Sequence, residues 1–195
     1  MLLRHIFAFL LFVFSTSSLV VFSTSSLADT IDVNFRDNSA QVQYRASMGR
    51  DTLGKAEFHM GLLYVDKNNL LGDFGILVRD DVGRNAPGIS VGVGLKAVSG
   101  KAKNYDASAL ALGGLVRYSP FADSRFGIIG QFYFSPNIVT FGDADRYLET
   151  TARFEYEIIP QASVYLGYRK VKFGLEQRPD VTLEEGGHLG VRIMF

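Results

Sequence analysis

Apolar and polar residues alternate along most of the chain after residue 28. The last segment shows this most clearly, because Leu189, Val191, Ile193 and Phe195 share one face and polar or small residues lie between them. A period of two residues places successive side chains on opposite faces of a β-strand. The pattern recurs in ten segments: 31–35, 42–48, 56–64, 70–78, 89–97, 110–118, 126–134, 148–158, 164–168 and 189–195. We expect ten antiparallel strands, or eight if the short first hairpin (31–48) lies outside the sheet.

The connections between these segments suggest how the strands cross a membrane. If the last strand runs toward the periplasm, the connections 135–146 and 174–184 lie on the outer side of the membrane, and the connections 119–124 and 159–161 lie on its inner, periplasmic side. The longer connections are then external, as in outer-membrane barrels. Every proline falls in a connection, where no ladder hydrogen bond is lost; these are Pro87, Pro120, Pro136, Pro160 and Pro179.

Alternation alone does not say which face points inward. A soluble lipocalin-like barrel has its apolar face inside, whereas a membrane barrel has it outside. Here the polar face is rich in glycine and carries charges of both signs, which suits pairing across a narrow lumen. The predicted ion-pair network comprises Arg45, Glu57, Asp73, Arg79, Arg117, Glu149, Arg153, Glu155, Glu157, Arg169 and Arg192. We therefore predict an all-β fold, a transmembrane antiparallel up-and-down β-barrel of about ten strands, with eight as the alternative.

The first 28 residues have the features of a secretory signal peptide. Arg4 and His5 form a basic start, 6–14 form an apolar core, and Ser26-Leu27-Ala28 is a small-x-small cleavage site. The polar run 15–18 makes the apolar stretch shorter than the ~20 residues of a spanning helix, which argues against an uncleaved anchor. We predict a signal peptide over 1–28 and a barrel over 29–195.

Composition narrows the function classes. The chain holds 20 Lys and Arg against 20 Asp and Glu, which argues against nucleic acid as a partner. Cysteine is absent, which excludes thiol catalysis and cysteine metal sites and fits an exported protein. No cofactor is predicted.

Candidates for catalysis are few. Glu57 and His59 share the inward face, and His188 also faces inward, so these three are the one plausible acid–base set. Membership of a hydrogen-bond network in the lumen is the simpler interpretation. Asp143 and Asp145 could bind a divalent cation, although two carboxylates in a polar loop are typical of a solvated turn. We predict no metal site and no catalytic residue.

Basic residues cluster just beyond the apolar band. Lys170 and Lys172 continue the lipid-facing register of 164–168, and Lys101, Lys103 and Arg146 lie at the same predicted level. They could meet lipopolysaccharide phosphates, or they could be ordinary interfacial residues with apolar stems.

The chain resembles a known family. The opening DVNFRDNSAQVQY (32–44), the ten alternating segments and the final HLGVRIMF (188–195) are similar to the YfaZ-type outer-membrane proteins of Gram-negative bacteria. The resemblance implies a small outer-membrane barrel and assigns Phe195 to recognition by the barrel-assembly machinery. It carries no catalytic or binding residues over.

These observations favour an integral outer-membrane protein of structural or passive role, in contact with outer-membrane lipid and lipopolysaccharide. Its lumen is predicted to be plugged or to be a very narrow channel for small solutes. The alternative is an outer-membrane barrel hydrolase acting on envelope lipid or protein.

Overall fold

A computed structural model describes residues 29–51, 54–65, 69–83, 86–102, 105–120, 125–175 and 178–195. The predicted signal peptide and Lys103 lie outside the described residues. The strands are β1 (Thr30–Arg36), β2 (Ser39–Asp51), β3 (Gly54–Val65), β4 (Asn69–Asp81), β5 (Ile89–Ala102), β6 (Tyr105–Tyr118), β7 (Phe126–Ser135), β8 (Thr140–Gly142), β9 (Ala144–Ile159), β10 (Ala162–Leu175) and β11 (Arg178–Met194). A 3₁₀ turn, η1 (Asn137–Val139), precedes β8.

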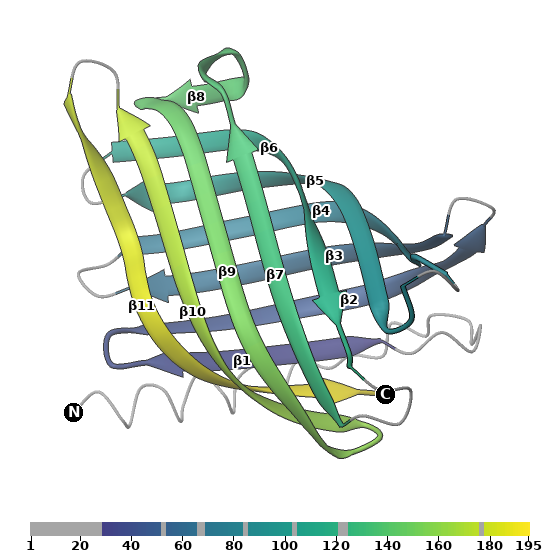
Figure 1. Ribbon diagram of the computed structural model, residues 1–195. Helices are drawn as coiled ribbons and strands as arrows, with labels where there is room; N and C mark the ends of the chain where they lie inside the picture. Colours follow the sequence, from purple (N-terminus) through teal and green to yellow (C-terminus); the bar gives the residue numbers. More distant parts are fainter. Residues whose placement is uncertain are drawn as a thin grey trace, which may run out of the picture.

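Ten of these strands close into one antiparallel ring (Figure 1). Each strand pairs with the next along the chain, β7 pairs with β9, and the pairing of β1 with β11 closes the ring. Strand β8 pairs with β6 beside the ring. The predicted ten-stranded up-and-down barrel is confirmed. The eight-stranded alternative is wrong, because β1 and β2 both belong to the ring.

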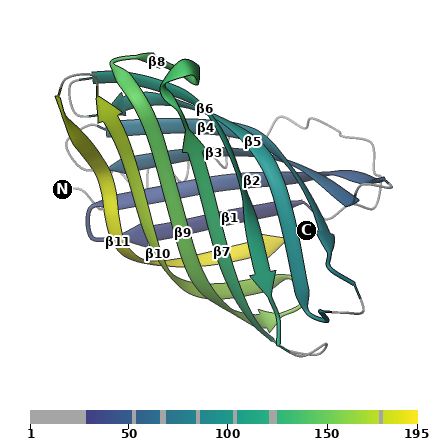
Figure 2. The ribbon, with the colours of Figure 1, turned by 45° about the horizontal axis from the view of Figure 1, so that its top comes forward.

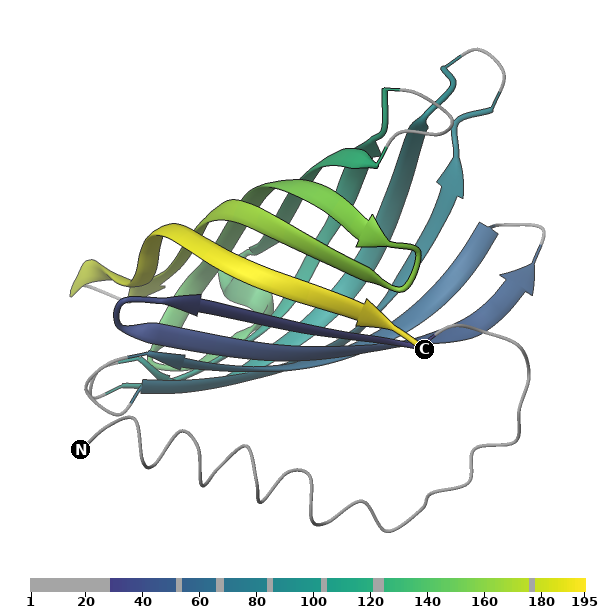
Figure 3. The same ribbon diagram turned by 90° about the horizontal axis from the view of Figure 1, so that it is seen from below.

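The first described residue, Asp29, and the C-terminal Phe195 lie at the same end of the barrel. The backbone groups of Asp29 and Phe195 bond to each other twice, each at 2.9 Å, and Figure 3 shows β1 and β11 side by side there. We call this the termini end, and the opposite end, where β10 turns into β11, the hairpin end. Strand β8 lies at the hairpin end (Figure 2). Strands β7 and β9–β11 cross the strands of the opposite wall (Figure 1), as the tilt of a closed barrel requires.

Large apolar side chains cover the outside of the ring. Every strand contributes some, and many are about half exposed or more, such as Val93 at 66%, Leu166 at 61% and Leu189 at 64%. A closed barrel pairs its backbone groups internally, so such a surface is compatible with lipid. The apolar face thus points outward, as predicted, and the soluble lipocalin-like alternative does not fit. No helix within the described residues is long and apolar enough to cross a membrane.

The connection lengths differ from the prediction. Most of the predicted connection 174–184 is paired strand, because β10 runs to Leu175 and β11 starts at Arg178. Register shifts beside Val171 and Phe173 bulge the strands and interrupt the alternation that marks them in the sequence. The connections 82–88 and 119–125 at the termini end are about as long as 136–143 at the hairpin end. The lengths of the connections therefore do not show which end of the barrel faces the periplasm.

The interior has two different halves. At the hairpin end the inward face is apolar and forms one buried cluster: Leu63, Val65, Leu71, Val98, Ala107, Ala109, Ala111, Tyr133, Ala144, Tyr147, Val171, Phe173, Leu175, Val181 and Leu183. We call it the apolar plug. Toward the termini end the interior is polar and charged. The sequence predicted the polar half and not the apolar plug.

Candidate functional site in the barrel lumen

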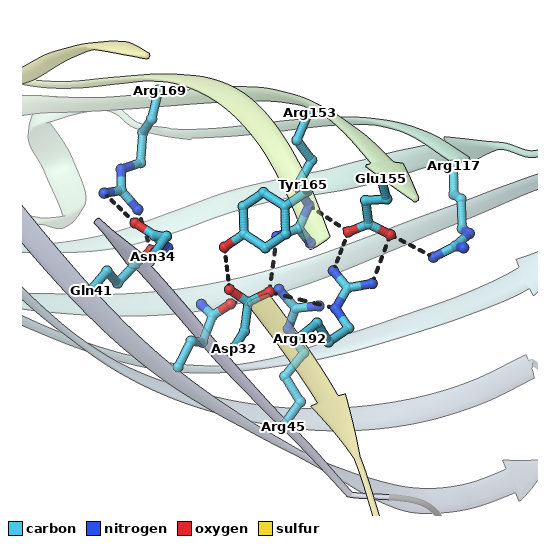
Figure 4. Close-up of polar contacts among 11 residues, drawn as sticks. Asp32, Asn34, Gln41, Arg45, Arg117, Arg153, Glu155, Tyr165, Arg169 and Arg192 are labelled. Atoms are coloured by element: carbon cyan, nitrogen blue, oxygen red, sulfur yellow. Dashed lines mark hydrogen bonds and ion pairs between the residues drawn. The ribbon is translucent and has the colours of Figure 1, made fainter. Parts of the chain in front are cut away.

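The centre of the polar half is built on two buried carboxylates from strands that are three steps apart in the ring. Asp32 of β1 and Glu155 of β9 are 1% and 2% exposed. Arg153 lies between them, with Nη1 3.1 Å from Asp32 Oδ2 and Nε 3.1 Å from Glu155 Oε1. Arg192 of β11 also contacts both, at 3.5 Å from Asp32 and 2.6 Å from Glu155 (Figure 4). Buried charges need such partners, because an unpaired one is costly. The sequence flagged all of these residues except Asp32.

An aromatic side chain locks this centre in place. The Tyr165 hydroxyl donates a hydrogen bond to Asp32, and the Arg153 guanidinium lies 5.0 Å from the Tyr165 ring centre. The Tyr165 ring occupies the space above Gly190, where a Cβ would overlap it. Gly167 makes similar room for the His188 ring, which would lie 2.6 Å from an added Cβ. The inward glycines therefore leave room for large neighbours, as predicted.

A second ion pair lies nearer the hairpin end. Arg169 of β10 contacts Glu184 of β11 at 2.9 and 3.0 Å, and it also donates to Asn34 and Gln41 (Figure 4). Ser39 donates to the same Glu184 at 2.7 Å. The sequence predicted Arg169 as part of the network and missed Glu184, because that residue fell in a predicted connection.

Below the apolar plug lies a layer of mixed polar and aromatic groups. Lys96 pairs with Glu149, which also accepts a hydrogen bond from Tyr147. The Lys96 ammonium lies 4.6 Å from the ring centre of Tyr133. On the neighbouring strands β3 and β4, Nε2 of His59 is 3.9 Å from Oδ1 of Asp73.

The remaining predicted network residues lie at the mouth of the termini end. Arg79 pairs with Glu57 at 2.6 Å, and Arg117 reaches Glu155 at 3.1 Å. Arg45 donates to Gln43 at 2.6 Å and forms no ion pair with a described carboxylate. No ion pair joins Glu157 to the described residues.

The predicted acid–base set is not assembled. Glu57 is held by Arg79, and His59 lies near Asp73 with its ring against Tyr133, 6.5 Å between centres. His188 packs edge-on against Tyr165 at 5.9 Å, beside the central ion pairs. In the part of the chain that the structure describes, no contact joins the three, so they do not form a catalytic centre.

The two carboxylates considered as cation ligands do not belong to a metal-binding cluster among the described residues. Asp143 lies in the turn between β8 and β9, and Asp145 lies in β9. No group of three or more His, Asp or Glu side chains within the described residues could hold a metal ion.

The basic residues predicted to meet lipopolysaccharide lie at the hairpin end, with Lys101 exposed on β5. Arg146 and Lys172 converge on Asp180, at 3.2 and 2.5 Å. Their hydrogen bonds lower the pKa of the Asp180 carboxyl. Lys170 pairs with Glu185 at 2.9 Å.

Comparison with known proteins places the chain in a family. A family model described as "YfaZ precursor" matches residues 11–195, nearly the whole chain. The chain belongs to the YfaZ precursor family. This confirms the family resemblance that the opening and closing segments carried. No curated protein sequence matches this YfaZ chain.

Two solved structures with a similar outline carry the name porin. "KdgM porin in complex with disordered oligogalacturonate" has a TM-score of 0.48 and 10% identity over 86% of the YfaZ chain and 99% of the porin chain. A second structure, "KdgM porin", has a TM-score of 0.47 and 10% identity over the same shares. At these values the architecture of the YfaZ barrel rests on its own strand pairing.

Proposed function

We propose that this chain is an integral outer-membrane β-barrel of passive or structural role whose lumen is closed to solutes. The closed ring and its apolar outside suit lipid on all sides. The predicted signal peptide supplies export to the periplasm, from which outer-membrane barrels insert. The exposed Phe195, at 63%, supports a role for the C-terminus in recognition by the assembly machinery.

The observation that carries the proposal is that side chains fill the lumen at two successive levels. At the first level Arg153 and Arg192 bridge Asp32 of β1 and Glu155 of β9. Arg117 of β6, the strand opposite β1 in the ring, also reaches Glu155. At the second level the apolar plug includes Tyr133, Tyr147 and Phe173, all at 0% exposure. Rings as large as these close a bore that is only slightly wider than that of an eight-stranded barrel.

The orientation of the barrel follows from its route of insertion. The termini arrive from the periplasm, so a barrel whose two ends meet at one side keeps that side periplasmic. The hairpin end then faces the outer leaflet, where lipopolysaccharide carries phosphates. A groove of about 250 Å³ on this outer face is lined by Phe134, Arg146, Leu148, Lys172 and Gly174.

This groove suits a phosphorylated lipid. Its two cations share the single carboxylate of Asp180, which leaves one positive charge for a phosphate, and its apolar residues suit an acyl chain.

We expect Arg146→Glu combined with Lys172→Glu to reduce co-purified lipopolysaccharide. The matched control is Lys55→Glu at the termini end. Equal lipopolysaccharide in both variants would contradict this contact.

Liposome swelling tests the closed lumen. Liposomes that contain the purified barrel should swell in arabinose or a disaccharide at the same rate as protein-free liposomes. A general porin in the same lipid is the positive control. Swelling near the porin rate would replace the closed barrel with a solute channel.

A further inference from the structure

The polar half of the lumen carries more positive than negative charge. Five arginines from five strands point into the lumen at the termini end, and three carboxylates lie among them. The arginines are Arg45, Arg79, Arg117, Arg153 and Arg192, and the carboxylates are Asp32, Glu57 and Glu155. We call this set the arginine vestibule. Two positive charges in it have no carboxylate of their own.

The charges further out at this end do not remove the excess. Lys55 and Arg125 add two positive charges, and Asp81 and Glu157 add two negative ones. Asp29 and Asp80, also at this end, continue the outward register of Ile31 and Val78, so they do not face the lumen. Among the described side chains of the inward register the excess is therefore unchanged.

The carboxylates of the vestibule are already shared. Glu155 contacts Arg117, Arg153 and Arg192, and Asp32 contacts Arg153 and Arg192. Glu57 pairs with Arg79. No described carboxylate of the vestibule lies within ion-pair distance of Arg45, and an anion from outside the protein would supply that partner.

Arg45 is the clearest sign that a ligand belongs here. Its one hydrogen-bond partner among the described side chains is the neutral Gln43, at 2.6 Å. Arg45 points toward Asp32 and Arg192 (Figure 4). Its charge is repelled by that of Arg153 and attracted by those of Asp32, Glu57 and Glu155, although no ion pair joins it to these carboxylates among the described side chains. A guanidinium has five N–H donors in a planar fork that matches a carboxylate or phosphate. Most of the donors of Arg45 are left for such an oxyanion.

The outer part of the vestibule is accessible to solvent, so an anion can reach it. The side chains of Arg79 and Arg117 are 33% and 31% exposed, whereas those of Arg153 and Arg192 beneath them are 7% and 8% exposed. The vestibule thus has accessible arginines at its rim and a fixed ionic floor. A low-dielectric wall around one sign of charge concentrates ions of the opposite sign.

We propose that the arginine vestibule binds an oxyanion, a carboxylate or phosphate group, that enters from the termini end. Arg45 and Arg117 hold the anion, and the pairs of Arg153 and Arg192 with the carboxylates form the floor that stops it. This goes beyond the closed barrel, since a lumen blocked by the apolar plug binds an anion without passing it. The periplasmic source of the anion rests on the proposed orientation; binding to the purified barrel does not.

Calorimetric titration of detergent-folded protein tests the site. The probes are citrate for carboxylates and inorganic phosphate for phosphates, each at constant ionic strength against sodium chloride. We expect saturable binding of at least one probe, which identifies the source of the oxyanion. Arg45→Gln and Arg117→Gln should each weaken it about tenfold or more, since each removes a charge-assisted contact. Arg36 lies at the hairpin end of β1, away from the vestibule. Arg36→Gln is therefore the matched control and should bind like wild type.

A stability measurement separates ligand binding from a structural role. Without anion, Arg45→Gln should unfold at a urea concentration close to that of wild type, because the substitution removes both the repulsion from Arg153 and the attraction to Asp32, Glu57 and Glu155. A clearly lower midpoint would show that Arg45 is a structural residue and would overturn the proposal. Absence of saturable binding to wild type, or equal binding by all four proteins, would also overturn it. If Arg45→Gln does not fold, the binding of Arg117→Gln compared with that of Arg36→Gln decides between the two roles.

Discussion

Removing Arg153 is the sharpest test of the ionic level that closes the lumen. Arg153→Ala deletes the ion pairs with Asp32 and Glu155, each at 3.1 Å, and the contact with the Tyr165 ring. Breaking a buried ion pair on one side costs about 3–5 kcal/mol. Arg192 still contacts both carboxylates, so the loss should fall at the lower end, about 3 kcal/mol.

The assay is reversible urea unfolding in detergent micelles, followed by the heat-dependent shift of the folded band on gels. Arg36→Ala serves as the matched control, since it removes an arginine outside the ionic centre. A double-mutant cycle of Arg153→Ala with Asp32→Ala should give a coupling free energy of about 1 kcal/mol or more. A loss for Arg153→Ala no larger than that of Arg36→Ala would refute the reasoning.

Two further substitutions and one deletion test other parts of the barrel. Val191→Arg places a charge on the lipid face and should destabilise the barrel by about 2–4 kcal/mol near the bilayer midplane; an unchanged urea midpoint would contradict a lipid-facing Val191. Deletion of Phe195 should lower the amount of barrel in outer-membrane fractions, and normal amounts would count against a role in assembly. Gly190→Ala should destabilise by about 1–3 kcal/mol, because the new methyl group overlaps the Tyr165 ring; wild-type stability would show that Tyr165 moves without cost.

The sequence predicted the outward face of the barrel well, because one side of each strand meets a uniform environment. Lipid selects apolar residues at every second position, so segments such as 189–195 and 89–97 show a clean period of two. The inward face is less regular. Adjacent apolar residues such as Leu62 and Leu63 hide the apolar plug, since both faces of the strand are apolar there.

The individual ion pairs could not be predicted from the sequence. Arg153 and Asp32 are 121 residues apart, and they meet because the pairing of β1 with β11 closes the ring and brings β1 within three strands of β9. That meeting depends on register and tilt, which alternation does not determine. Glu184 was missed for a local reason: bulges in β10 and β11 break the period of two. An inward acidic residue beside such a break was the signal that could have revealed it.

Single-channel recording in planar lipid bilayers tests the closed lumen most directly. The wild-type barrel should insert without steps of porin-like conductance in 1 M KCl, and Arg153→Ala should stay closed as well, because the apolar plug still fills the lumen at its second level. Porin-like steps from wild type, left unchanged by Arg153→Ala, would contradict the account and make the protein an open pore.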